Sequence, residues 1–378
     1  MFVHQNQLEH LLVPSQYFSQ EQYERELAGV LGTSWHLVGT KADLPKTGDF
    51  ITVDVLGQPI QIRNFSGEYH AFLNVCSHRH CLLTSKVRGN SPTLRCQYHG
   101  WEYEATGRTR KIPEASCFRP FDRENARLLK YPLASVGDLL FVCLSPEPQP
   151  LKEFLGDVYA ELEQRFAAPY QQNWSWEYPF GFNWKLGLEN TMESYHIPAV
   201  HPKSFSGVSP SEPNMTHILD ERFSTLVYDH REDRWATFWQ RVAMKAMGGP
   251  TTDIYKHHVV YPNLVFVFTD AMAYCQEYIP VSRNRSRTKL RMYSFRSQRM
   301  SPQAKLTGWV VAKSLCRDVR RIMVEDEQIC TQQQLGMESS RYCGIIGTRE
   351  ERIYTFQKYL QERCGASNQS DRQLVMQS

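Results

Sequence analysis

Two short boxes that each combine a cysteine with a histidine constrain this chain more than any other feature. The first box contains Cys76 and His78, the second contains Cys96 and His99, and seventeen residues lie between His78 and Cys96. A 2Fe-2S cluster with two thiolates on one iron and two imidazoles on the other needs this ligand set on two facing loops. Neutral imidazoles also raise the reduction potential, because they remove negative charge relative to four thiolates.

A structural zinc site is the alternative interpretation of these four residues. Zinc fingers usually have two cysteines in one box and two histidines in the other, whereas here each box has one of each. Both boxes also lie between segments whose residues alternate as β-strands do. We therefore expect Cys76, His78, Cys96 and His99 to bind a 2Fe-2S cluster.

Length and patterning predict two main domains. A chain of 378 residues usually exceeds what one hydrophobic core supports. Short alternating segments with Gly and Pro between them predict a small antiparallel β domain at 35–146, and Pro146-Glu-Pro-Gln-Pro reads as a linker. Mixed helical and strand patterns follow at 147–365. A helical segment is expected at 1–34 and a flexible polar tail at 366–378.

Charge and hydropathy exclude several classes of protein. A net charge of +3 is too small to suggest nucleic-acid or membrane-surface binding. The longest apolar runs are too short to cross a bilayer, and the N-terminus does not resemble a signal peptide. We therefore expect a soluble cytoplasmic protein whose cysteines outside the boxes are reduced thiols.

A second group of metal-binding residue types begins at His196. His201 follows five positions later, and a regular helix would place the two imidazoles about 140° apart. Pro198 lies between them and supplies a break that can bring them together. Two histidines and one carboxylate on one face of an iron, with open positions opposite, form the ligand set of mononuclear Fe(II) oxygenases.

Asp326 is the candidate for the carboxylate. It lies in a helix predicted at about 302–337, in the middle of an apolar face, whereas Glu325 and Glu327 lie about 100° to either side. That face is formed by Val319, Ile322, Met323, Ile329 and Cys330. A carboxylate buried there is costly unless it is paired or binds metal. The alternative is that the histidines are ordinary residues and that Asp326 pairs with Arg320 or Arg321.

The two boxes, with His99-Gly100-Trp101, resemble the Rieske domain of Rieske non-haem iron oxygenases, and the resemblance extends from about Trp35 to Leu360. It implies an α+β chain: a small antiparallel β Rieske domain, then a larger helix-grip-type catalytic domain with an antiparallel sheet around a C-terminal helix. It also implies that His196, His201 and Asp326 bind iron. Two departures stand out: His80 replaces a glycine that is common there, and Cys81 has no partner for the disulfide of respiratory Rieske proteins.

In the family a carboxylate carries electrons between subunits, and Glu193 matches its position. The implied route runs from His99 of one subunit to Glu193 of the next and then to its His196. Many aromatic dioxygenases have Asp here, and Glu occurs in relatives that resemble oxygenases of quaternary ammonium compounds. The alternative for Glu193 is a solvated helix residue.

The resemblance implies a catalytic (alpha) subunit that hydroxylates a small organic substrate with O₂, as a mono- or dioxygenase, in a homotrimer. The chain has no Gly-rich dinucleotide fingerprint, so a separate flavin- or ferredoxin-type reductase would oxidise NAD(P)H. The choice between an aromatic substrate and an N-methyl or quaternary ammonium substrate stays open. An electron-transfer protein without oxygenase activity and a zinc-stabilised binding protein are the other candidate functions.

The substrate pocket is expected in the second domain. Its predicted wall comprises His257, His258, Tyr261, Asn263, Phe266 and Phe268. Trp235, Phe238 and Trp239 are candidates for an aromatic cage around a methylammonium group, or for ordinary packing.

Overall fold

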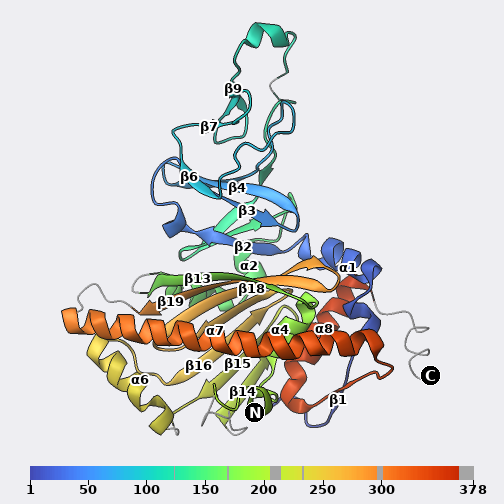
Figure 1. Ribbon diagram of the computed structural model, residues 1–378, viewed down its shortest axis with the longest axis vertical. Coiled ribbons are helices and arrows are strands. Elements are labelled where there is room, and N and C mark those ends of the chain that lie inside the picture. The colour runs from blue at the N-terminus through green and yellow to red at the C-terminus, as the bar shows by residue number, and fades with distance from the viewer. Residues whose placement is uncertain (123, 168–169, 205–213, 232–233, 296–300, 366–378) are drawn as a thin grey trace. The chain divides into compact units, whose positions relative to one another are not determined.

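The computed structural model describes residues 1–378 except 123, 168–169, 205–213, 232–233, 296–300 and 366–378, and it leaves out the side chains of 234–237 and 239. The chain divides into two compact units (Figure 1). The smaller unit is Gly32–Phe154, and the larger combines Met1–Leu31 with Leu155–Ser378. Most of the N-terminal segment expected at 1–34 therefore groups with the C-terminal part of the chain.

This N-terminal segment is only partly helical. It contains strand β1 (Leu8–Glu9), a 3₁₀ turn at Pro14–Tyr17 and helix α1 (Gln20–Glu26), which continues as a π-helical turn at Leu27–Leu31. Ser19 caps α1, because its side chain accepts a hydrogen bond from the backbone N–H of Gln22. β1 pairs with β20 (Ile345–Ile346) from the far end of the sequence.

The smaller unit is built from antiparallel strands, as the alternating sequence predicts. A five-stranded sheet has the order β10-β5-β4-β3-β6, and two three-stranded sheets have the orders β11-β12-β2 and β7-β8-β9. The strands are β2 (Trp35–Thr40), β3 (Asp49–Val55), β4 (Gln58–Phe65), β5 (Glu68–Leu73), β6 (Arg88–Asn90), β7 (Leu94–Arg95), β8 (Glu102–Tyr103), β9 (Thr109–Lys111), β10 (Lys130–Tyr131), β11 (Leu133–Val136) and β12 (Leu139–Cys143).

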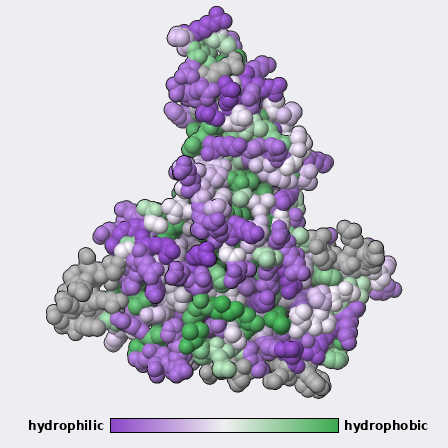
Figure 2. All heavy atoms as spheres, turned by 180° about the vertical axis from the view of Figure 1, so that it is seen from behind, coloured by the Kyte–Doolittle hydropathy of each residue, from purple (hydrophilic) through white to green (hydrophobic). Residues whose placement is uncertain are grey.

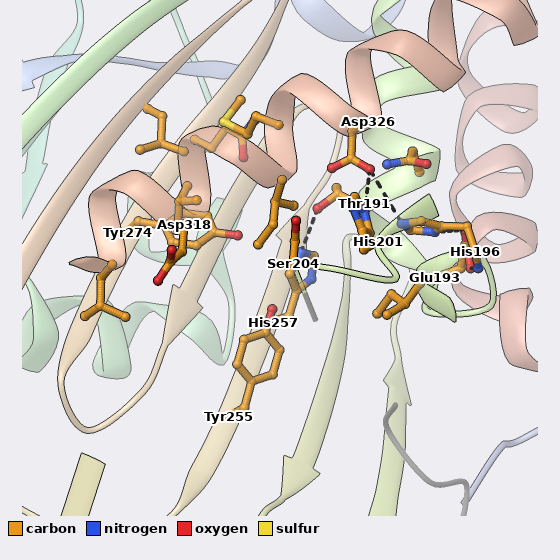
Figure 3. Close-up of a pocket in the computed structure, with 18 of the residues that line it drawn as sticks. Thr191, Glu193, His196, His201, Ser204, Tyr255, His257, Tyr274, Asp318 and Asp326 are labelled. Atoms are coloured by element: carbon orange, nitrogen blue, oxygen red, sulfur yellow. Dashed lines mark hydrogen bonds and ion pairs between the residues drawn. The ribbon is translucent and has the colours of Figure 1, made fainter. Parts of the chain in front are cut away.

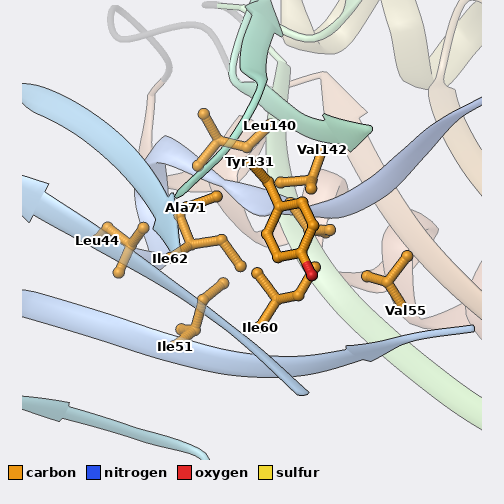
Figure 4. Packing of buried hydrophobic residues seen from close by; sticks show 10 residues of the cluster. Leu44, Ile51, Val55, Ile60, Ile62, Ala71, Tyr131, Leu140 and Val142 are labelled. Atoms are coloured by element: carbon orange, nitrogen blue, oxygen red, sulfur yellow. The ribbon is translucent and has the colours of Figure 1, made fainter. Parts of the chain in front are cut away.

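One buried core of this unit lies between the five-stranded sheet and the β11-β12-β2 sheet. Ile60 and Ile62 of β4 pack with Leu140 and Val142 of β12, and all four side chains are buried (Figure 4). Residues at every second position of a strand point to one face of the sheet. The alternation read from the sequence is therefore the pattern that forms this core.

The larger unit contains a seven-stranded antiparallel sheet of order β13-β19-β18-β17-β16-β15-β14. The strands are β13 (Tyr170–Phe180), β14 (Met215–Leu219), β15 (Phe223–Asp229), β16 (Ile254–Val260), β17 (Leu264–Phe268), β18 (Met272–Ser282) and β19 (Arg285–Phe295). β13 is the first strand of the sheet in sequence, yet it lies at one edge and pairs with β19, the last.

Helices accompany this sheet. They are α2 (Leu151–Leu155), which spans the boundary between the units, α3 (Val158–Arg165), α4 (Trp184–Met192), α5 (Ile197–Val200), α6 (Arg234–Met247), α7 (Pro302–Ser339) and α8 (Glu351–Cys364). α7 is one unbroken helix of 38 residues that crosses the face of the sheet (Figure 1). Ser301 caps it by accepting from the N–H of Ala304, and Pro302 occupies its first turn. The α+β architecture, with an antiparallel sheet and a C-terminal helix, is confirmed.

Polar residues dominate the face seen in Figure 2, and apolar residues gather mainly in a band over the larger unit. Within the described part of the chain, none of the helices combines the length and the apolar character that a membrane span requires.

Candidate metal centres

The two Cys-His boxes form loops with the same backbone turn. In the first loop the N–H of His80 donates to the carbonyl of Cys76 at 3.1 Å, and the N–H of Cys76 donates to the carbonyl of Cys81 at 2.8 Å. The second loop repeats both bonds, from Gly100 to Cys96 at 3.1 Å and from Cys96 to Trp101 at 2.8 Å. The boxes are therefore matched in conformation as well as in ligand type.

Each turn contains a residue in the left-handed region. Gly100 has φ +72° and His80 has φ +59°. Glycine adopts this conformation without steric cost, whereas other residues do so at a cost. This explains why the resemblance predicts glycine at position 80, and it shows that His80 leaves the turn intact.

The four candidate cluster ligands lie close together. The rings of His78 and His99 have centroids 4.8 Å apart, and Cys76 and Cys96 are both buried. The indole of Trp101 stacks on His78 at 4.6 Å, and the hydroxyl of Tyr103 lies 3.0 Å from Sγ of Cys76. Burial lowers the pKa of His78, and the neighbouring His99 lowers it further, which favours the neutral imidazole that binds metal. All ten cysteines are free, including Cys81.

In the larger unit, His196 and His201 lie at the two ends of the one-turn helix α5. Pro198 occupies the start of this helix, and the ring centroids of the two histidines are 5.2 Å apart. The helix is therefore interrupted between Met192 and Ile197, before Pro198, and not at Pro198 as expected. α4 ends at Met192 and Glu193 has an extended backbone conformation, so Glu193 is not the solvated helix residue of the alternative interpretation.

Asp326 of α7 completes this group (Figure 3). Its Oδ1 lies 2.9 Å from Nε2 of His201 and 3.6 Å from Nε2 of His196. One ligand atom from each of the three residues lies within 4.8 Å of the others. Two imidazole nitrogens and a carboxylate oxygen at these separations suit a facial Fe(II) site.

The outer nitrogen of each imidazole contacts a second carboxylate. Nδ1 of His196 contacts Glu193, and Nδ1 of His201 lies 2.8 Å from Oε2 of Glu325. Such contacts fix the ring orientation of metal-binding histidines and leave Nε2 for the metal. Ser204 donates to Glu325 at 2.7 Å. Glu325 lies off the apolar face that identifies Asp326, so its role was not predicted, although its adjacency to Asp326 is a signal that could have found it.

The electrostatics of this group favour a cation. Burial works to lower the pKa of His201, but Asp326 and Glu325 outweigh it and raise the pKa. The site therefore stabilises positive charge beside His201. A divalent metal supplies that charge, and the donor set fits iron.

A cavity of about 320 Å³ adjoins these residues (Figure 3). Alternate residues of β18 line it, namely Met272, Tyr274, Gln276 and Tyr278, together with one face of α7, namely Leu315, Asp318, Val319, Ile322, Met323 and Asp326. α4, the 193–204 segment, β16 and β19 contribute Asn190, Thr191, Glu193, His196, Ile197, His201, Ser204, Tyr255, His257 and Leu290.

Only one residue of the predicted wall lines this cavity. His257 does so, whereas His258 points to the opposite face of β16 and contacts Glu161. Tyr261, Asn263, Phe266 and Phe268 are buried but absent from the cavity lining. The prediction included β16 but was wrong about β17, which contributes no residue to the lining, and it missed β18, which contributes four. Within β16 it lacked the phase that decides which residues face inward. Ile329 is also misplaced, since its side chain is 43% exposed.

Comparison with known protein families matches both units. A model described as "Rieske [2Fe-2S] domain" matches residues 34–132. A model described as "Ring hydroxylating alpha subunit (catalytic domain)" matches residues 168–366, which is about half of the chain.

Curated relatives include dioxygenases and monooxygenases. The chain is 30% identical over 272 residues to the anthranilate 1,2-dioxygenase large subunit of Acinetobacter baylyi, which covers 67% of this chain and 57% of the relative. It is 31% identical over 205 residues to the glycine betaine monooxygenase oxygenase subunit of Chromohalobacter salexigens. This match covers 53% of this chain and 45% of the relative. The matched part of this chain thus spans about half the length of these relatives.

Solved structures share the fold over nearly the full length. A quaternary ammonium Rieske monooxygenase in complex with L-carnitine superposes with a TM-score of 0.74 at 18% identity, covering 93% of this chain and 95% of the other. Naphthalene 1,2-dioxygenase with indole bound superposes with a TM-score of 0.73 at 17% identity. The match covers 99% of this chain and 95% of the other. The chain belongs to the ring-hydroxylating alpha subunit family, with a Rieske 2Fe-2S domain followed by a catalytic domain that binds mononuclear Fe(II).

Proposed function

We propose that this chain is the catalytic subunit of a Rieske oxygenase, which hydroxylates a small organic substrate with O₂. The observation that carries this proposal is the convergence of His196, His201 and Asp326 at one cavity, in a chain that also contains the two matched Cys-His loops. Electron transfer alone would need no cavity beside a second ligand group. The electron-transfer and zinc-binding alternatives are therefore not favoured.

In this proposal Cys76, His78, Cys96 and His99 hold the cluster, and His196, His201 and Asp326 hold Fe(II). Bound iron would supply O₂ activation. Glu193 and Glu325 orient the two imidazoles through their Nδ1 atoms. The apolar side chains of α7 exclude water from the cavity and position the substrate.

Electrons would come from a separate NAD(P)H-dependent reductase through the cluster. We propose that they pass from His99 of one subunit to Glu193 of a neighbouring subunit and on to its His196, in a homotrimer. Two observations support this route: Glu193 contacts Nδ1 of His196, and His99 is only partly buried. The second carboxylate oxygen of Glu193 accepts from the backbone N–H groups of Tyr195 and His196, so the carboxylate is held in place beside the iron ligand.

The charge of the lining favours a neutral or cationic substrate. Three carboxylates line the cavity, from Glu193, Asp318 and Asp326, and among the described lining residues there is neither Lys nor Arg. A substrate carboxylate would have no protein counter-charge there. The rings of Tyr255, Tyr274 and Tyr278 suit either an aromatic ring or a methylammonium group.

The aromatic cage suggested by the sequence receives no support. Phe238 lies on α6 with 47% of its side chain exposed and is absent from the cavity lining. The side chains of Trp235 and Trp239 lie outside the described residues.

The test is metal and sulfide analysis with EPR of the dithionite-reduced protein, on wild type, Asp326→Ala and Asp318→Ala. Asp318 is the matched control, because it lies on the same face of α7 and lines the same cavity. We expect a Rieske-type signal in all three proteins and loss of about one iron per chain in Asp326→Ala only. Equal iron in all three would overturn the assignment of Asp326, and zinc without sulfide would overturn the redox function.

A further inference from the structure

We propose that the hydroxyl of Thr191 is a directed hydrogen-bond donor for an acceptor atom of the substrate, and that Arg352 fixes this direction through His257. The proposal rests on the proposed function only in taking the cavity as the substrate site. It adds a chemical requirement on the substrate: a carbonyl, ether or hydroxyl oxygen near the iron-binding end.

The first element is a fully buried guanidinium. Arg352 of α8 is 0% exposed. Its Nε donates to Oγ of Ser224 at 3.1 Å, its Nη1 to the carbonyl of Met192 at 3.1 Å, and its Nη2 to the carbonyls of Ser224 and His257 at 3.2 Å. Nη2 also lies 3.0 Å from Nδ1 of His257. All of these partners are neutral acceptors.

The direction of the next bond follows from chemistry. A guanidinium has donors only, so Nδ1 of His257 must accept from Arg352 and cannot carry a proton. The neutral ring then has its proton on Nε2. Burial, with Arg352 adding to it, lowers the pKa of His257 well below its ordinary value, in agreement with a neutral ring.

The proton on Nε2 of His257 points to Thr191. The distance from Nε2 to Oγ1 is 3.0 Å, and the hydroxyl oxygen must be the acceptor because Nε2 is the donor. A hydroxyl has one proton of its own to donate. That proton must therefore find an acceptor other than His257.

Within the described structure, Thr191 has no such acceptor. Helical threonines often donate to the carbonyl four residues earlier, as Thr307 does to Gln303 at 3.0 Å and Thr355 to Glu351 at 3.2 Å. No equivalent bond to Gly187 is formed in the described residues. Thr191 lines the same cavity as His201 and Asp326 (Figure 3).

The relay Arg352–His257–Thr191 therefore offers a preoriented donor at the iron-binding end of a largely apolar cavity. A substrate with an acceptor oxygen gains a hydrogen bond there, whereas a hydrocarbon isostere leaves the hydroxyl unpaired. Thr191 acts as a specificity-determining residue, and His257 and Arg352 act as positioning residues behind it.

The probes are acetophenone and 2-phenylpropene, which differ in a carbonyl oxygen against a methylene group. Their dissociation constants are measured by calorimetry on the iron- and cluster-loaded protein, without O₂ or reductant. We expect Thr191→Val to reduce the preference for acetophenone about fivefold to tenfold, and Thr191→Ser to retain it. If the ratio of the two dissociation constants is the same in Thr191→Val as in wild type, the proposal is overturned.

The relay is tested through His257. Gln can accept from Arg352 through its oxygen and donate to Thr191 through its nitrogen, so His257→Gln should preserve the preference that His257→Met loses. A merely structural role of His257 would lower the affinity for both probes equally. If both His257→Gln and His257→Met lose the preference for acetophenone, Arg352 and His257 do not orient the Thr191 hydroxyl.

A crystal structure of the loaded protein provides a readout that does not depend on either probe. We expect a water or ligand atom within about 3.2 Å of Oγ1 of Thr191 in wild type and in Thr191→Ser. A Thr191 hydroxyl bonded to the carbonyl of Gly187 instead would refute the directed donor. Iron analysis of the same samples separates this outcome from failure of the proposed function, since Thr191 is not among the iron ligands.

Discussion

The ammonium of Lys185 lies 2.6 Å from Oε1 of Glu26, and both side chains are completely buried. Trp184 donates to the other carboxylate oxygen at 2.9 Å. Glu26 ends α1, and Lys185 and Trp184 begin α4, the helix that leads to Glu193 and His196. The N-terminal segment is thus attached through buried charge to the start of the helix that precedes Glu193 and His196.

We expect Lys185→Met to destabilise the protein by about 3–5 kcal/mol, because it leaves the Glu26 carboxylate buried without a counter-charge. The free energy of unfolding in urea measures the effect. Lys358→Met is the control, since Lys358 lies 4.0 Å from Glu362 in an exposed pair. That pair should contribute less than about 1 kcal/mol. If the two variants lost equal free energy of unfolding, the buried pair would not stabilise the protein more than the exposed pair does.

Glu325 should matter for iron affinity although it is not a ligand. Removing the carboxylate that orients Nδ1 of His201 is expected to weaken iron binding about 10–100-fold in Glu325→Ala. Competition with a calibrated chelator measures this. Glu327→Ala is the matched control on the same helix, because Glu327 accepts from Tyr178 at 2.8 Å instead of contacting His201. Similar affinity in both variants would argue against orientation by Glu325.

His80→Gly should be neutral or stabilising by up to about 1 kcal/mol, because glycine relieves the left-handed backbone but loses more entropy on folding. His80→Val should cost about 1–3 kcal/mol, since a β-branched residue fits this conformation poorly. Thermal unfolding of the cluster-loaded protein compares the two. If valine were tolerated as well as glycine, the turn could not have the conformation found here.

Acid should weaken the attachment of the first residues to α8. Burial works to raise the pKa of Glu351, but hydrogen bonds from His217 and from the N–H groups of Val3 and His4 lower it to about 2. A carboxyl whose folded pKa is depressed stabilises the protein above its unfolded pKa of about 4.3, and this stability is lost as pH falls toward 2.

The free energy of unfolding of wild type should therefore fall by about 3 kcal/mol more between pH 5 and pH 2 than that of Glu351→Gln. Urea midpoints at pH 7, 5, 3 and 2 show this as a shallower acid dependence in the variant. Glu362→Gln, at an exposed carboxylate, should follow wild type. Parallel curves for Glu351→Gln and wild type would refute the assignment.

Ligand chemistry made much of both metal centres predictable from the sequence. Mixed Cys-His boxes and a carboxylate within an apolar helical face are local patterns, and the structure brings both sets of residues together. Their roles as ligands remain predictions. The fold class followed from strand alternation and from the resemblance together.

Other features depend on contacts that no local pattern encodes. The inward face of β16 is set by pairing with β15 and β17, so His257 and His258 could not be distinguished in advance. Glu325 looked solvent-facing on its helix, and only the position of His201 gives it a partner. Arg352 and Thr191 are 161 positions apart in sequence, so their link through His257 requires the tertiary structure.

α7 extends unbroken over 38 residues, about 57 Å, and carries Asp326 about two turns beyond Val319 and Asp318. Backbone hydrogen bonds set the spacing between these positions, so it does not change with the side chains that face the cavity. Substitutions at Leu315, Val319 or Ile322 can therefore reshape the cavity while Asp326 keeps its position relative to the two histidines. A chain built in this way can diversify in the molecules it accepts without rebuilding the centre that acts on them.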